Sequence, residues 1–157
     1  EVVLVDDHSA DATPKIAEAL NSRRKSINGS KILIAGIAYK RDIDDMRESP
    51  ALDVMSLLHE KGARVEYADP WVPNLDGHEW TGGFDMKAVE LSPERLRKAD
   101  CVVITTDHKA FDYAQIVREA DVIVDTRNAI KGEHAKVFKL GSGRRADERT
   151  RPAGAAV

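Results

Sequence analysis

Three cations stand where an anionic ligand would be bound: Lys40, Arg47 and Arg127. Lys40 follows an apolar run that ends at Gly36, Arg47 precedes a Ser-Pro pair typical of a helix start, and Arg127 follows a later apolar run. Lysine offers phosphate oxygens a point charge, and arginine a planar fork of donors. If these runs are parallel strands, their carboxyl ends meet at one edge of a sheet, where open α/β sheets bind ligands. The pattern therefore predicts a site for a phosphate-bearing ligand.

The same cations have a plainer interpretation as surface residues paired with neighbouring acids. The acids that stand near them in the sequence are Asp42, Asp44, Asp45 and Glu48. Exposed pairs of this kind are common and contribute little to stability. The shared position of the cations on one predicted edge favours ligand binding.

Three other residues with chemical potential receive more modest predictions. Asp69 ends a strand-like run, and we expect it to cap a loop with Pro70 rather than to bind a ribose. His108, in TTDHKAF, either donates to a ligand or caps the helix that follows. Cys101 opens an apolar run and is predicted to be a buried structural thiol, so no catalytic residue is assigned. The five histidines lack paired metal-ligand spacing, and no metal site is expected.

The elements that must position these residues follow from apolar periodicity. Continuous apolar runs predict strands at Val2–Val5, Ile32–Ile37, Val65–Tyr67, Val102–Thr105 and Val122–Val124. Helical patterns include Ile16–Leu20, Ala51–Glu60, Pro93–Lys98 and Tyr113–Glu119. Strands that alternate with helices predict an α/β fold: a doubly wound, mostly parallel Rossmann-like sheet with helices on both faces.

Local signals divide the chain further. Ser49 is the predicted N-cap of a helix that has Pro50 at its first position and ends at Gly62. The range 70–83 is predicted to be a loop, either a lid or a long connection. We expect an atypical strand and helix segment over 1–28, a Rossmann-like domain over 29–140 and a disordered tail over 141–157.

Composition narrows the class of protein. The chain has 157 residues, of which 42% are hydrophobic and 32% charged, as in an ordinary globular domain. A net charge of −3 gives no general attraction to nucleic acid or to anionic membranes. No apolar run approaches a membrane span, and the single cysteine suits a reducing compartment. We therefore expect a cytoplasmic protein with no nucleic-acid or membrane partner.

Four segments in order resemble the C-terminal, UDP-binding domain of the UDP-glucose/GDP-mannose dehydrogenase family. They are GIAYKRDIDDMRESPALDV, GARVEYADPWVP, ADCVVITTDHKAF and VDTRNAI. The Tyr-Lys pair and RESPALDV look most like the branch that oxidises UDP-N-acetylhexosamines. Enzymes of this family oxidise the sugar C6 alcohol to a carboxylate in two NAD-dependent steps, through an intermediate bound to a cysteine thiol.

The resemblance also implies roles for single residues. Tyr39 and Lys40 match an aromatic-Lys pair that contacts the UDP-sugar, and Arg127 matches an arginine at the uridine-diphosphate end. Arg47 matches the arginine of the RES motif, which reaches NAD across the domain cleft. An N-terminal Rossmann domain holds NAD in the family, and a central helical domain supports dimerisation. The resemblance therefore allows a homo-oligomer among the partners of this chain.

Two departures from the family pattern limit what this chain can do alone. GIAYKR lacks the G-x-G-x-x-G fingerprint, and no Gly-Gly-x-Cys motif that would supply the catalytic thiol is present. The chain alone is expected to be inactive, with NAD and the chemistry held on N-terminal and central domains that it lacks. The alternative is a non-catalytic nucleotide-binding or interaction module left by truncation or fusion.

The opening EVVLVDDHSADAT does not match the family. It is similar to the nucleotide-sugar motif of family-2 glycosyltransferases and to the first strand of response-regulator receivers, so a receiver-like switch is a further, weaker alternative. The plainest interpretation is a strand capped by Asp6, Asp7 and Ser9 before a helix. A fusion, a gene rearrangement and a sequencing artefact each explain such a junction.

Overall fold

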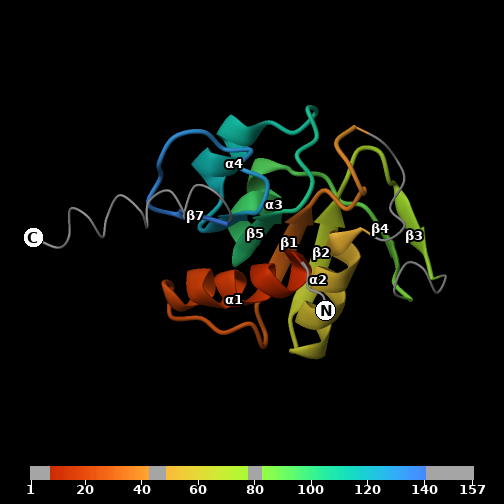
Figure 1. Ribbon diagram of the computed structural model, residues 1–157, viewed down its shortest axis with the longest axis horizontal. Helices are drawn as coiled ribbons and strands as arrows, with labels where there is room; N and C mark the ends of the chain where they lie inside the picture. Colours follow the sequence, from red (N-terminus) through yellow and green to blue (C-terminus); the bar gives the residue numbers. More distant parts are fainter. Residues whose placement is uncertain (1–7, 43–48, 78–82, 141–157) are drawn as a thin grey trace, which may run out of the picture.

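The computed structural model describes residues 8–42, 49–77 and 83–140 (Figure 1). Three predicted features lie outside these ranges: the strand Val2–Val5, the cation Arg47 and the tail from residue 141. Of the acids proposed as neighbours of the cations, Asp44, Asp45 and Glu48 also lie outside them. Within the described ranges, no helix is long and apolar enough to cross a membrane.

Helices and strands alternate along much of the described chain, as the apolar runs predict. In order they are α1 (His8–Asn21), β1 (Lys31–Ala35), α2 (Pro50–Glu60), β2 (Arg64–Ala68), β3 (Asn74–Asp76), β4 (Asp85–Lys87), α3 (Pro93–Lys98), β5 (Cys101–Ile104), α4 (Tyr113–Glu119), β6 (Ile123–Asp125) and β7 (Val137–Lys139). The exceptions are that β3 and β4 follow β2 and that β7 follows β6 with no helix between. Because α1 begins at His8, Ser9 lies inside this helix and not in a strand cap before it, while Asp6 and Asp7 lie outside the described residues.

The main sheet has five strands in the order β2-β1-β5-β6-β7, and every neighbouring pair is parallel. Ile32 of β1 is aligned with Val65 of β2 on one side and with Cys101 of β5 on the other. Parallel strands joined by helical crossovers place all their carboxyl ends at one edge. The predicted doubly wound, Rossmann-like sheet is confirmed.

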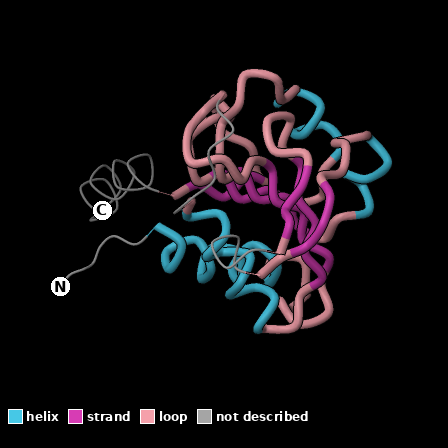
Figure 2. Tube along the Cα trace, turned by 90° about the vertical axis from the view of Figure 1, so that its right-hand side faces the viewer, coloured by secondary structure: helices cyan, strands magenta, loops and turns pink. Residues whose placement is uncertain are grey.

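Helices lie on both sides of the main sheet (Figure 2), and alternation along β1 divides the core into two layers. Ile32 and Ile34 point into a cluster with buried residues of α1 and α2, while Leu33 and Ala35 join a cluster with α3 and α4. All four side chains are fully buried. A strand covered on both faces has no polar side to show, which explains its continuous apolar sequence.

Side-chain caps set the starts of the helices. The hydroxyl of Ser49 accepts from the backbone N–H of Ala51 at 3.2 Å, and Pro50 occupies the first helical position. Gly62, with a φ of +93°, follows the last turn of α2. Ser92 and Asp112 cap α3 and α4 in the same way. The predicted limits of α2 are confirmed.

Two elements differ from the sequence prediction. The range 70–83 is not only a loop, because β3 lies inside it and pairs antiparallel with β4, with Leu75 opposite Met86. The short β7 adds a fifth parallel strand beside β6. Both features rest on three-residue strands, too short to give a recognisable apolar run.

The turn after β1 depends on a close approach that only glycine allows. Gly36 has a φ of +91°, and a Cβ atom placed there would lie 2.5 Å from the carbonyl oxygen of Thr106. Its N–H donates to the carbonyl of Ala68 at 2.8 Å. The absence of a side chain therefore lets the first loop pack directly against the loop after β5.

We expect Gly36→Ala to lower the free energy of unfolding by about 3 kcal/mol, because backbone strain and a steric clash act together. Gly29→Ala is the matched control, since Gly29 has a φ of +85° but no atom within 4 Å of the position that a Cβ would take. Strain alone should make the control lose only about 1 kcal/mol. Urea unfolding followed by circular dichroism measures both, and equal losses would contradict the close-approach explanation.

Candidate functional site

Four loops meet at the carboxyl edge of the sheet and carry the predicted site residues. They follow β1, β2, β5 and β6 and contain, respectively, Lys40, Asp69, His108 and Arg127. The edge therefore brings these four residues to one end of the molecule, as parallel strands require. Arg47 lies outside the described residues.

The buried carboxylate of Asp69 joins three of these loops. Its Oδ2 accepts from the backbone N–H groups of Ile37 at 2.8 Å and Ala38 at 3.0 Å, and from Nε2 of His108 at 2.9 Å. Its Oδ1 accepts from the N–H of Trp71 at 2.7 Å. The predicted loop-capping role of Asp69 is confirmed, and it reaches further than the turn with Pro70.

These contacts decide the charge state of Asp69. Burial opposes ionisation, but the hydrogen bonds from His108 and from the backbone N–H groups of Ile37 and Trp71 outweigh it and hold the pKa of Asp69 below its ordinary value. The carboxylate is therefore an internal anion at neutral pH. Its charge is compensated inside the protein by three backbone N–H groups and the ring of His108.

His108 has neither of its two predicted roles. Its side chain is fully buried, with Nε2 on Asp69 and Nδ1 accepting from the N–H of Asp42 at 2.8 Å. The helix that follows is capped by Asp112 instead. His108 cannot contact a ligand from this position or cap α4, because the packing of the first loop encloses its ring.

A second carboxylate, that of Asp107, lies between two arginines. Its Oδ2 accepts from Nη2 of Arg41 at 2.6 Å, and its Oδ1 is 3.9 Å from Nε of Arg127. Burial opposes ionisation of Asp107, but the bond from Arg41 and the charge of Arg127 lower its pKa. Sequence reasoning missed Arg41 and Asp107, although each adjoins a predicted residue.

Lys40 and its neighbour Tyr39 face solvent. The ammonium of Lys40 lies 5.8 Å from the centroid of the Tyr39 ring, and the tyrosine is 47% exposed. Within the described part of the chain, Lys40 makes no ion pair. Of the acids in the alternative interpretation only Asp42 is described. Its carboxylate accepts from the backbone N–H of Lys109 at 3.0 Å, and among the described residues it makes no ion pair with a lysine or an arginine.

The loop that presents Arg127 is organised by a third carboxylate. Asp125 is fully buried at the end of β6 and accepts from the N–H groups of Arg127, Ala129 and Ile130 at 2.8–3.1 Å. Asn128 takes a left-handed φ of 57° in this turn. The loop closes around the buried charge, while the side chain of Arg127 stays 44% exposed.

The first loop does not suit a dinucleotide. In that role its N–H groups would bind a pyrophosphate, but those of Ile37 and Ala38 already donate to Asp69, and Gly36 packs against Thr106.

Cys101 does not suit catalysis, because burial raises the pKa of its thiol to about 12. Among the described residues, the loop after β1 therefore does not fit NAD, and the prediction of a structural thiol agrees with the burial of Cys101.

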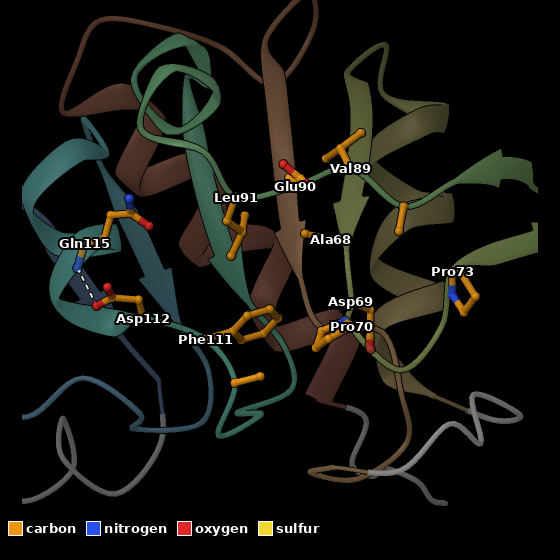
Figure 3. Close-up of a pocket in the computed structure, with 12 residues that line it drawn as sticks. Ala68, Asp69, Pro70, Pro73, Val89, Glu90, Leu91, Phe111, Asp112 and Gln115 are labelled. Atoms are coloured by element: carbon orange, nitrogen blue, oxygen red, sulfur yellow. Dashed lines mark hydrogen bonds between the residues drawn. The ribbon is translucent and has the colours of Figure 1, made fainter.

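A cavity of about 470 Å³ opens beside Asp69, between the end of β2 and the start of α4 (Figure 3). Its polar lining includes Glu90 and Asp112, and its apolar lining includes Leu91 and Phe111. None of the residues that line it is a lysine or an arginine. An anionic ligand would therefore meet no cationic side chain in this cavity.

The chain is similar to known proteins over most of its described length. A family model described as the UDP binding domain of the UDP-glucose/GDP-mannose dehydrogenase family matches residues 33–132. UDP-N-acetyl-D-mannosamine dehydrogenase of Campylobacter jejuni is 36% identical over 61% of this chain and 23% of that protein. UDP-glucose 6-dehydrogenase of Rhizobium meliloti is 34% identical over 70% of this chain and 26% of that protein.

The fold comparison agrees. The structure of UDP-D-ManNAc dehydrogenase from Pyrococcus horikoshii superposes with a TM-score of 0.67 and 27% sequence identity, over 87% of this chain and 31% of that one. The chain spans about a quarter to a third of the length of these relatives.

The lowered pKa of Asp69 predicts how stability depends on pH. Because the unfolded chain binds this proton more readily than the native one, Asp69 stabilises the fold above the ordinary carboxyl pKa. That contribution is lost as pH falls from about 5 through the lower native pKa. Asp69→Asn should lower the free energy of unfolding at pH 7 by about 1–3 kcal/mol. It should also make the free energy of unfolding decrease less steeply as the pH falls.

Urea unfolding between neutral and acidic pH tests this expectation. Glu133→Gln is the control, since Glu133 is an exposed carboxylate on a loop near β7. An Asp69→Asn profile parallel to that of the wild type would show that another group causes the acid sensitivity.

Proposed function

Because this chain belongs to the UDP-glucose/GDP-mannose dehydrogenase family and contains its UDP-binding domain, we propose that it binds the UDP end of a nucleotide sugar for an NAD-dependent 6-dehydrogenase. The reaction would oxidise the sugar C6 alcohol to a carboxylate. The names of the relatives support a UDP-N-acetylhexosamine or UDP-glucose as the substrate.

The observation that carries this proposal is the exposed pair of cations, Lys40 and Arg127, on loops of one sheet edge. Each is presented by a loop wrapped around a buried carboxylate, Asp69 for the first and Asp125 for the second. A diphosphate is a compact dianion that two such cations would hold electrostatically. Hydrogen bonds that already order these loop segments would lower the entropy that binding costs.

Arg127 is available for this role although Asp107 is near. The separation of 3.9 Å between Nε and Oδ1 exceeds a hydrogen-bond distance, so a phosphate would not have to break a close pair. Arg41, by contrast, holds Asp107 at 2.6 Å and would keep that carboxylate away from the ligand. The exposed ring of Tyr39 would pack against the sugar or the ribose.

In this proposal, NAD binding and the chemical steps take place on the part of the longer relatives that this chain does not cover. The backbone donors of the loop after β1 are occupied by Asp69, and the thiol of Cys101 is buried. Arg47 would extend from this domain towards NAD bound elsewhere. An NAD-binding domain and a catalytic cysteine would be supplied by another part of a longer protein or by a second chain.

Calorimetric titration of the purified chain with UDP tests the proposed anion site. Lys40→Ala and Arg127→Ala should each weaken binding by about 1.5–3 kcal/mol, the contribution of a charge-assisted hydrogen bond. Lys61→Ala is the control, because Lys61 is exposed at the end of α2, on the opposite edge of the sheet. Unchanged affinity in both site variants would remove the assignment.

An NAD-reduction assay with several UDP-sugars tests whether NAD binding and the chemical steps require protein other than this chain. The chain alone should give no turnover, because it offers no exposed thiol among its described residues and no dinucleotide fingerprint. Addition of a candidate partner that carries both should restore NADH formation, followed by absorbance. Turnover by the chain alone would contradict the proposal.

A further inference from the structure

We propose that His108 is a positioning residue that fixes the Lys40 loop through a single neutral tautomer, an inference that rests on the proposed UDP-binding function. The ring is buried and does not touch the ligand edge. Its contribution is to hold Asp42, which directly follows Tyr39, Lys40 and Arg41 in the loop after β1.

The hydrogen-bond geometry defines the tautomer. The backbone N–H of Asp42 can only donate, and it points at Nδ1 of His108 over 2.8 Å. Nδ1 must therefore carry a lone pair, which leaves the ring proton on Nε2. Nε2 lies 2.9 Å from Oδ2 of Asp69, an acceptor in its ionised form. Each ring nitrogen thus has one partner of the complementary kind.

One connected network consequently anchors the segment 37–42 of this loop at two points. Ile37 and Ala38 donate to Asp69, and Asp42 donates to His108. Asp42 has a left-handed φ of 60°, a conformation that a non-glycine residue keeps only when its surroundings hold it. Lys40 lies between these two anchors.

The ring itself has little freedom. Its edge packs against Phe111, with ring centroids 5.4 Å apart, and the carbonyl of His108 accepts from the hydroxyl of Tyr113 at 2.7 Å. A fixed ring transmits its position to Asp42. The affinity for a diphosphate should then depend on the bond to Nδ1 more than on the bond from Nε2, because only the former reaches Asp42, which lies beyond Lys40 in the loop.

Two substitutions separate these bonds. The side-chain oxygen of His108→Asn overlays Nδ1 and keeps an acceptor for Asp42, while the side-chain nitrogen of His108→Gln overlays Nε2 and keeps a donor for Asp69. Both remove one hydrogen bond and part of the same ring. We expect His108→Gln to bind UDP about two- to twelve-fold more weakly than His108→Asn, the range for one lost hydrogen bond.

Calorimetric titration of each variant with UDP tests the positioning role of His108. Thermal unfolding of the same variants measures their stability. Equal affinities in the two variants, or weaker binding by His108→Asn, would overturn the positioning role. A purely structural role would lower both stabilities without this difference in affinity. A wild-type chain that binds no UDP would instead remove the proposed function itself, so the two failures are distinguishable.

The wild-type chain offers a second test that needs no variant. Long-range ¹H–¹⁵N correlation spectra report which ring nitrogen of a histidine carries the proton. At neutral pH His108 should show an unprotonated Nδ1 and a protonated Nε2. The opposite tautomer would overturn the inference even if His108→Gln failed to fold.

Discussion

The ionised carboxylate of Asp69, buried at the end of β2, is the interaction on which the ligand edge depends. One side chain takes backbone donors from two loops and a ring donor from a third. A buried charge is costly unless it is fully hydrogen-bonded, and here four donors compensate it. The result is a rigid junction at the position where a parallel sheet presents its loops to a ligand.

A similar arrangement occurs at the end of β6, where the carboxylate of Asp125 accepts hydrogen bonds from three backbone N–H groups of the loop that follows. In both loops the anion is kept inside and a cation is presented outside, Lys40 in one and Arg127 in the other. A chain of net charge −3 thus exposes two cations on loops of one sheet edge, with Asp107 beside one of them. Local placement of charge, not the net charge, determines which ligand such an edge attracts.

The internal anion also explains why a Rossmann-like sheet need not bind a dinucleotide by itself. The fold makes backbone N–H groups available after its first strand, and a dinucleotide domain leaves them for the pyrophosphate. Here Asp69 uses them for the architecture of the loop, and Gly36 permits contact with Thr106 in place of a ligand. The loop after β1 is therefore built differently from a dinucleotide-binding loop.

The sequence alone determined the parallel sheet, the ends of α2 and the gathering of Lys40 and Arg127 at one edge. These follow from local patterns, because apolar runs, caps and the polarity of parallel strands need no knowledge of distant partners. It also allowed the family resemblance, which the comparisons confirm.

Only the tertiary structure decided which polar groups meet. His108 pairs with Asp69 across 39 residues of sequence, and Arg41 pairs with Asp107 across 66. Nothing local distinguishes a histidine that faces a ligand from one that faces a buried carboxylate, so His108 was assigned two roles that it does not have. The three-residue strands β3, β4 and β7 were missed for the same reason, because they exist only through pairing with a neighbouring strand.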